Sequence, residues 1–93
     1  MHWCYVLYSP AINRFYVGET EDLELRISQH KSGFFKNSYT SKASDWQLYI
    51  SLCCRDRSHA RKVELFIKKI KSKKFIFNLK DSFEVQADII NRF

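Results

Sequence analysis

Two stretches near the start of the chain have the alternating pattern of short β-strands. Residues Trp3–Tyr8 and Arg14–Gly18 are rich in aromatic and β-branched side chains, which suit a pleated, half-buried surface. A proline and an asparagine, both frequent turn formers, lie between them. The pattern predicts a β-hairpin in which Tyr5 and Tyr16 lie nearly opposite one another.

The next segment has the spacing of a short helix followed by a loop. Asp22 can cap a helix over about Leu23–Lys31, and Gly33 is placed to end it. Phe34–Ser44 is polar and lacks periodicity, so we expect a mobile loop. Its candidate phosphate contacts are Lys36, Asn37, Tyr39, Thr40 and Lys42.

Apolar and polar residues alternate again in residues 46–52, and this alternation predicts a half-buried third strand. The side chains expected to face inward are Trp46, Leu48, Ile50 and Leu52.

A long helix is predicted to start at Asp56 or Ser58 and to run to about Lys71. Its apolar positions recur at steps of three and four, namely Ala60, Val63, Ile67 and Ile70. A weaker amphipathic segment, Ser82–Phe93, closes the sequence. The order of elements indicates a single α+β domain.

Composition limits the class of protein. Of the 93 residues 45% are hydrophobic, with eight phenylalanines, five tyrosines and two tryptophans, which excludes a disordered chain. No apolar run approaches the roughly 20 residues of a membrane span, and the first strand is too short for a signal peptide. We expect a soluble, cytoplasmic protein without a membrane partner.

The three cysteines fit the same compartment. Cys4, Cys53 and Cys54 are an odd set without the spacing of metal ligands. Adjacent strand residues point to opposite faces, so Cys53 and Cys54 cannot serve one site together. We expect buried or half-buried reduced thiols, as in a reducing cytoplasm.

The formal net charge is +6, and the basic residues are clustered. From residue 55 to 80 only Asp56 and Glu64 oppose ten basic side chains. Such clustering favours a polyanionic partner, above all nucleic acid; a solvated helix face that keeps the protein soluble is the alternative. The ten are Arg55, Arg57, Arg61, Lys62, Lys68, Lys69, Lys71, Lys73, Lys74 and Lys80.

Charged and polar residues interrupt the apolar faces of both predicted helices. Arg26 and His30 continue the stripe set by Leu23 and Ile27, and Glu64 lies beside the apolar face of the long helix. Buried charges need partners, a metal or a substrate. One interpretation is a structural Arg26–Glu64 ion pair, with His30 at the edge of the core.

The same residues also suit phosphodiester hydrolysis. Glu64 could hold a divalent cation whose other ligands are water and phosphate, as Mg²⁺ prefers. Arg26 could neutralise charge that develops on the phosphate. A tyrosine hydroxyl could orient or deprotonate water, provided that positive charge lowers its pKa from about 10.

These motifs resemble the GIY-YIG nuclease family. Its two triplets correspond to Trp3–Cys4–Tyr5 and Tyr16–Val17–Gly18, although the first has lost its glycine and isoleucine. The stretch from Tyr16 to His30 is similar to the family's strand-to-helix segment, and the likeness continues through Glu64 to Lys74. It is strongest to small stand-alone bacterial members related to the structure-specific subfamily.

The resemblance implies a small three-stranded antiparallel sheet flanked by helices, and a role for each matching residue. Tyr5 would activate water, Tyr16 would contact water or the scissile phosphate, and Arg26 would stabilise the transition state. His30 would hydrogen-bond near them, and Glu64 would be the ligand of one Mg²⁺ or Mn²⁺ ion. Asn78 stands where many members have a late asparagine. The implied catalytic set is Tyr5, Tyr16, Arg26, His30 and Glu64.

Three functions follow as hypotheses. The first is a single-metal DNA endonuclease, with branched or flapped DNA among its substrates and DNA repair as its context. The second is a non-catalytic nucleic-acid-binding module that keeps the fold. The third is a protein adaptor, for which Phe34 and Phe35 are the only indication. The side chains expected to bind nucleic acid are Lys36, Lys42, Arg61, Lys68 and Lys71.

Overall fold

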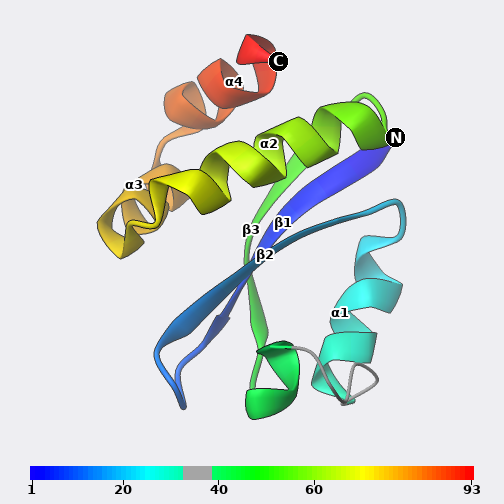
Figure 1. Ribbon diagram of the computed structural model, residues 1–93, viewed down its shortest axis with the longest axis vertical. Helices are drawn as coiled ribbons and strands as arrows, with labels where there is room; N and C mark the ends of the chain where they lie inside the picture. Colours follow the sequence, from blue (N-terminus) through cyan, green and yellow to red (C-terminus); the bar gives the residue numbers. More distant parts are fainter. Residues whose placement is uncertain (33–38) are drawn as a thin grey trace.

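The computed structural model describes residues 1–32 and 39–93 and has the expected α+β architecture (Figure 1). Within these residues a three-stranded antiparallel sheet is combined with four α-helices and one short 3₁₀ helix. In chain order the elements are β1 (His2–Ser9), β2 (Arg14–Thr20), α1 (Leu23–Lys31), η1 (Tyr39–Lys42), β3 (Gln47–Cys54), α2 (Arg57–Ile70), α3 (Lys73–Asp81) and α4 (Phe83–Arg92).

The strand order is β2-β1-β3, so β1 is central and β2 lies at an edge. The β1–β2 hairpin is as predicted, with Tyr5 paired to Gly18 and Leu7 to Tyr16. The predicted tyrosine pair is therefore offset by two residues along the strands. One side of β2 has no strand partner among the described residues, and this free edge borders the candidate site.

Two hydrophobic clusters lie on opposite faces of the sheet. Alternation along β1 places Cys4 and Val6 in the larger cluster, with α2, α3 and α4, whereas Tyr5 and Leu7 belong to the smaller cluster, with α1. Helices α1 and α2 accordingly lie on opposite sides of the sheet (Figure 1).

The third strand departs from the predicted alternation. Leu48 is 42% exposed, whereas Trp46 is fully buried in the cluster beside α1. The cause is an irregularity in the register, because Val6 pairs with Ile50 but Leu7 pairs with Leu48, which leaves one residue of β3 extra, as in a β-bulge. The prediction of an inward Leu48 was wrong.

The cysteines follow the strand pattern. Cys4 and Cys54 are buried and Cys53 is exposed, so the adjacent pair does point to opposite faces. The expectation that all three thiols are at least half-buried was wrong for Cys53. Burial raises the pKa of the Cys4 thiol above its usual range, which keeps this thiol protonated.

Side-chain caps start the predicted helices. The Asp22 carboxylate accepts a hydrogen bond from Leu25 N (3.1 Å), and the Asp56 carboxylate accepts one from His59 N (2.8 Å). The long helix ends at Ile70, which is 36% exposed. The rest of its predicted stripe is buried, and the inward assignment of Ile70 was wrong because the chain turns away at this point.

Helix α3 was not anticipated. Its lysines resemble a continued basic segment, but Ile76 and Leu79 are buried at a spacing of three, and the Ser72 hydroxyl caps the helix by accepting from Phe75 N (3.1 Å). Helix α4 lies within the predicted amphipathic segment and buries Ile89.

The predicted loop Phe34–Ser44 contains η1, so part of it is helical. Lys36, Asn37, Phe34, Phe35 and Gly33 lie outside the described residues. None of the described helices is long and apolar enough to cross a membrane.

Candidate active site

Gly18 sets the position of Tyr5. The two residues are paired across β1 and β2, and a Cβ on Gly18 would lie 2.6 Å from the Tyr5 hydroxyl oxygen and 3.1 Å from the Tyr16 ring. The missing side chain thus leaves a slot through which the Tyr5 ring reaches from the central strand across the edge strand. The absence of a side chain at Gly18 is therefore what allows the Tyr5 ring to pack here.

Four of the five predicted catalytic residues form one cluster on the α1 side of the sheet. The Tyr5 hydroxyl lies 2.9 Å from Nε2 of His30 and also makes a hydrogen bond with Arg26. The ring centroids of Tyr16 and His30 are 5.0 Å apart. Tyr5 and His30 are buried, while Tyr16 and Arg26 are half-buried, so the cluster is accessible from the side of the latter pair.

The electrostatics of this cluster correct one sequence-based expectation. Burial raises the pKa of the Tyr5 hydroxyl above its usual value, and the neighbouring Tyr16 raises it further, although the charge and hydrogen bond of Arg26 oppose the shift. Positive charge therefore does not make Tyr5 a ready base here, since burial outweighs it.

The surroundings of His30 keep its imidazole neutral, the form whose unprotonated nitrogen can accept a hydrogen bond. Burial, assisted by the positive charge of Arg26, lowers the pKa of His30 from 6.5 to about 4. His30 is consequently neutral at pH 7, and its Nε2 can accept a hydrogen bond from the Tyr5 hydroxyl.

Glu64 occupies the other side of the sheet, on α2. Its Oε2 accepts a hydrogen bond from Nζ of Lys68 (2.6 Å), and Nη1 of Arg61 lies 3.9 Å from its Oε1. The residue is only 5% exposed, and Oε1 is buried without a hydrogen bond among the described residues. A buried carboxylate oxygen of this kind is costly unless a ligand completes it.

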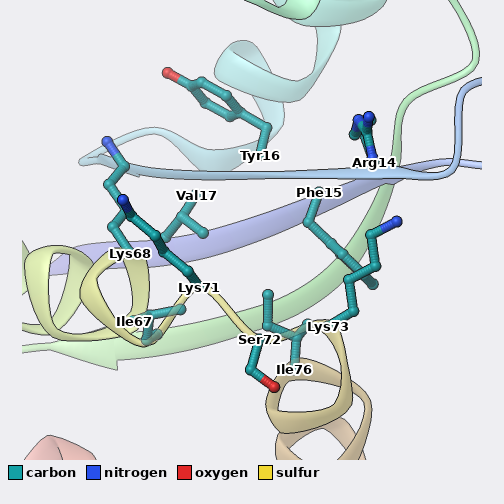
Figure 2. Close-up of a pocket in the computed structure, with 10 residues that line it drawn as sticks. All are labelled: Arg14, Phe15, Tyr16, Val17, Ile67, Lys68, Lys71, Ser72, Lys73 and Ile76. Atoms are coloured by element: carbon teal, nitrogen blue, oxygen red, sulfur yellow. The ribbon is translucent and has the colours of Figure 1, made fainter.

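Glu64 and the tyrosine cluster meet at the free edge of β2. The negative charge of Glu64 is close enough to raise the pKa of Tyr5. Figure 2 shows Tyr16 on the α1 side of β2 and Val17 on the α2 side. The predicted catalytic residues therefore come from both faces of the sheet and converge around its edge.

Two cavities extend along this edge in opposite directions. One, of about 380 Å³, is lined by Phe15, Val17 and Lys68, and the other, of about 550 Å³, by Thr20 and Arg26. On β2 the residue between the two linings is Gly18, and on α2 Glu64 lies between Arg57 and Ile67, which line one cavity each. The candidate site thus lies between two cavities at the edge formed by β2 and α2, and these flanking cavities are called the groove below.

The donor set at Glu64 fits a single divalent cation. Among the residues that the structure describes, no group of three or more histidine, cysteine, aspartate or glutamate side chains could hold a metal. Glu64 Oε1 offers one carboxylate oxygen, and the remaining positions would go to water and substrate oxygens, as in many Mg²⁺ sites. The fit rests on this oxygen, which is buried and accepts no hydrogen bond among the described residues.

The predicted nucleic-acid contacts are only partly gathered at the site. Lys68 and Lys71 line the 380 Å³ cavity, and Arg61 is exposed beside Glu64. Lys42 is exposed at the end of η1, and Lys36 lies outside the described residues. Asn78 is exposed on α3 and lines neither cavity.

Sequence reasoning missed two contributions. It assigned Lys68 to nucleic acid alone, yet Lys68 also binds the Glu64 carboxylate; a lysine four residues after a glutamate was the available signal. It also left Lys73 without a role, although this residue lines the 380 Å³ cavity from α3. That position was obscure because α3 itself was not recognised.

Comparison with known protein families gives one match. The GIY-YIG catalytic domain family matches residues 1–78, from the first strand into α3. No curated protein and no solved structure matches the chain significantly.

Proposed function

Because the chain belongs to the GIY-YIG nuclease family, we propose that it is a divalent-metal-dependent endonuclease that hydrolyses phosphodiester bonds in DNA. Family membership implies nuclease activity on a nucleic-acid substrate. The observation that carries the specific proposal is the buried Oε1 of Glu64, which accepts no hydrogen bond among the described residues although Arg61 lies 3.9 Å away, near the Tyr5–His30 pair.

Glu64 would hold one Mg²⁺ or Mn²⁺ ion through this oxygen. When bound, the ion would polarise a phosphate oxygen and lower the pKa of a bound water. Lys68 holds the second carboxylate oxygen, which fixes the side-chain rotamer and leaves Oε1 as the atom available to a ligand.

Tyr5 and His30 would move the proton. With His30 neutral and protonated at Nδ1, its Nε2 accepts a hydrogen bond from the Tyr5 hydroxyl (2.9 Å). As water attacks, Tyr5 would accept the water's proton and pass its own to His30 Nε2, so that no free tyrosinate forms. This relay agrees with the raised pKa of Tyr5.

Arg26 and Tyr16 would act on the phosphate. Arg26 is half-buried and lines the 550 Å³ cavity, from which its charge can stabilise the negative charge that grows in the transition state. Tyr16 is half-buried on the edge strand, where its hydroxyl can hydrogen-bond water or a phosphate oxygen.

A non-catalytic nucleic-acid-binding module remains the alternative. The basic face of α2 would serve such a module equally well. It would gain nothing from a buried carboxylate oxygen that accepts no hydrogen bond, which costs stability, nor from a neutral histidine held against a tyrosine. These two features favour the enzyme.

Nicking of supercoiled plasmid DNA tests the proposal, with branched and flapped duplexes as further substrates. Glu64→Gln keeps the side-chain shape and removes the charge, and we expect it to lower Mg²⁺- or Mn²⁺-dependent cleavage by about 100-fold or more. Glu84→Gln, an exposed glutamate on α4, is the matched control and should retain activity. Binding of Mn²⁺ without DNA, measured by calorimetry, should also be lost in Glu64→Gln only.

Equal cleavage by Glu64→Gln and wild type would remove the proposed site. Salt-sensitive binding of every DNA tested, without cleavage by wild type in either metal, would instead support the binding module.

A further inference from the structure

The 380 Å³ cavity between β2 and the α2–α3 junction has an apolar floor and a cationic rim (Figure 2). Its floor is formed by Phe15, Val17, Ile67 and Ile76. In Figure 2, Lys68 and Lys71 lie on one side of it and Lys73 on the other. A volume of this size suits a small organic group with one apolar face.

Charge restricts what can enter. None of the residues that line the cavity is acidic. Lys68 is bound to Glu64, and Lys73 donates a hydrogen bond to the backbone oxygen of Asn13 (2.9 Å). Lys71 forms no ion pair among the described residues, so its charge is uncompensated and suits an anion.

The backbone of Lys71 adds an independent observation. Lys71 caps α2 in the left-handed conformation, with φ 53°, where glycine or asparagine is usual because a Cβ is strained. The lysine at this position therefore carries a backbone cost that glycine would avoid.

The position of the cavity connects it to the candidate active site. It shares Lys68 with the Glu64 carboxylate and begins at Val17, next to the Gly18 slot. The apolar floor can receive the face of a base only if that base is unpaired and unstacked, because a duplex hides its base faces.

We propose that this cavity binds one unpaired nucleotide of the substrate strand, next to the cleavage site. The base lies on the apolar floor and the flanking phosphates contact Lys71 and Lys73. The inference rests on the proposed function in one respect, that the bound strand is the strand cut at Glu64. The protein would then favour DNA with a single-stranded segment beside the scissile bond.

Metal-free binding of DNA with a single-stranded extension of about ten nucleotides, measured by fluorescence anisotropy, tests this proposal. An abasic site is moved through the extension one position at a time. We expect wild type to lose about tenfold in affinity at one or two adjacent positions and little elsewhere. Lys71→Gly should lower the affinity for DNA with the intact extension several-fold.

Two controls separate the cavity from general charge and from misfolding. Lys74→Ala removes the same charge from an exposed neighbour that does not line the cavity and should bind more tightly than Lys71→Gly. Since glycine relieves the strained backbone, Lys71→Gly should unfold at an equal or higher denaturant concentration than wild type. A loss of binding in this variant cannot then come from loss of folding.

Three results would overturn the inference: an affinity that is insensitive to the abasic position, equal binding of blunt duplex, or equal effects of Lys71→Gly and Lys74→Ala. Displacement of the DNA by polyglutamate at matched charge would assign the cavity to acidic peptides instead. A position-dependent abasic effect in a protein that cleaves no DNA would retain the cavity and reject the endonuclease. DNA cleavage by a protein whose affinity does not depend on the abasic position would instead support the endonuclease and reject the nucleotide-binding cavity.

Discussion

Gly18 is the single residue on which the geometry of the site depends most. Gly18 lies within a regular strand, and the absence of a side chain leaves room for the hydroxyl end of Tyr5 above the edge strand. That hydroxyl makes hydrogen bonds with both His30 and Arg26. A methyl group at Gly18 would therefore disturb Tyr5 and its two partners, and it would also contact the Tyr16 ring.

Gly18→Ala should lower stability by about 1–3 kcal/mol, since its Cβ would lie 2.6 Å from the Tyr5 hydroxyl and the ring is too enclosed to move freely. Urea unfolding measures this cost. The double variant Gly18→Ala/Tyr5→Leu is the control: the shorter leucine does not reach Gly18, so the two changes should be strongly non-additive. If the losses in unfolding free energy were additive, Gly18 would not be leaving space for the Tyr5 ring.

His30 should make stability depend on pH. Its pKa is about 4 in the folded protein and 6.5 when unperturbed, so between these values the unfolded chain binds more protons than the folded chain. The contribution of neutral His30 to the free energy of unfolding is then fully present above pH 6.5 and is lost as the pH is lowered towards 4. Urea midpoints between pH 4 and 7.5 measure the slope, which His30→Gln should reduce; an unchanged slope in that variant would contradict a buried, neutral His30.

At the scale of elements, the sheet edge is what assembles the site. Alternation sends Tyr5 and Val6 to opposite faces, and helices cover both faces. Only at β2, which lacks an outer strand among the described residues, can side chains from α1 and α2 approach a common substrate. This accounts for the placement of the predicted catalytic residues Arg26 and His30 on α1 and Glu64 on α2.

Helix α4 has a supporting role, because it packs on β3 and its Ile90 carbonyl oxygen accepts a hydrogen bond from His59 Nε2 (2.7 Å). Ile89→Ala should cost about 2–4 kcal/mol, since Ile89 is 2% exposed. Nicking activity per folded molecule should stay unchanged. Val85→Ala, at a 38% exposed site on the same helix, is the control and should cost less than about 1 kcal/mol.

Measurement combines urea unfolding with nicking at a temperature where both variants are folded. A large loss of activity in folded Ile89→Ala would place α4 in the catalytic machinery, contrary to this assignment.

At the scale of the whole molecule, charge distribution and groove agree. The net charge of +6 would attract any polyanion, but the groove between β2 and α2 gives that attraction a direction. The 380 Å³ cavity has basic and no acidic lining residues, whereas Arg26, Arg55 and Arg57 line the 550 Å³ cavity together with Glu19, Glu21 and Asp56.

DNA affinity should therefore fall steeply with salt. If about four to six basic side chains neutralise phosphates, log Kd should rise with log salt with a slope of roughly 4 to 5. Metal-free anisotropy titrations in NaCl measure this slope. Lys68→Met should reduce it by about one, whereas Lys80→Met, whose ammonium lies over the Tyr49 ring, should not; equal slopes in all three proteins would contradict the groove.

Much of this organisation was predictable because it is local. The hairpin, α1, α2 and the amphipathic end follow from periodicity and caps that act within a few residues. Leu48 was misplaced since one extra residue in β3 inverts the alternation, and α3 was missed since its lysines concealed two buried residues. The extra residue in β3 has no signal of its own in the local pattern, whereas α3 has a Ser72 cap and an Ile76–Leu79 spacing that the basic residues obscured.

The sequence by itself determined which residues are chemically unusual: Arg26, His30 and Glu64 interrupt apolar stripes, and the two tyrosines lie on paired strands. Their arrangement on the two sides of the free edge of β2, the neutral state of His30 and the burial that keeps Tyr5 from ionising readily depend on the tertiary structure. The physical reason is that residue type follows from local periodicity, whereas proximity, burial and pKa depend on which distant segments pack together.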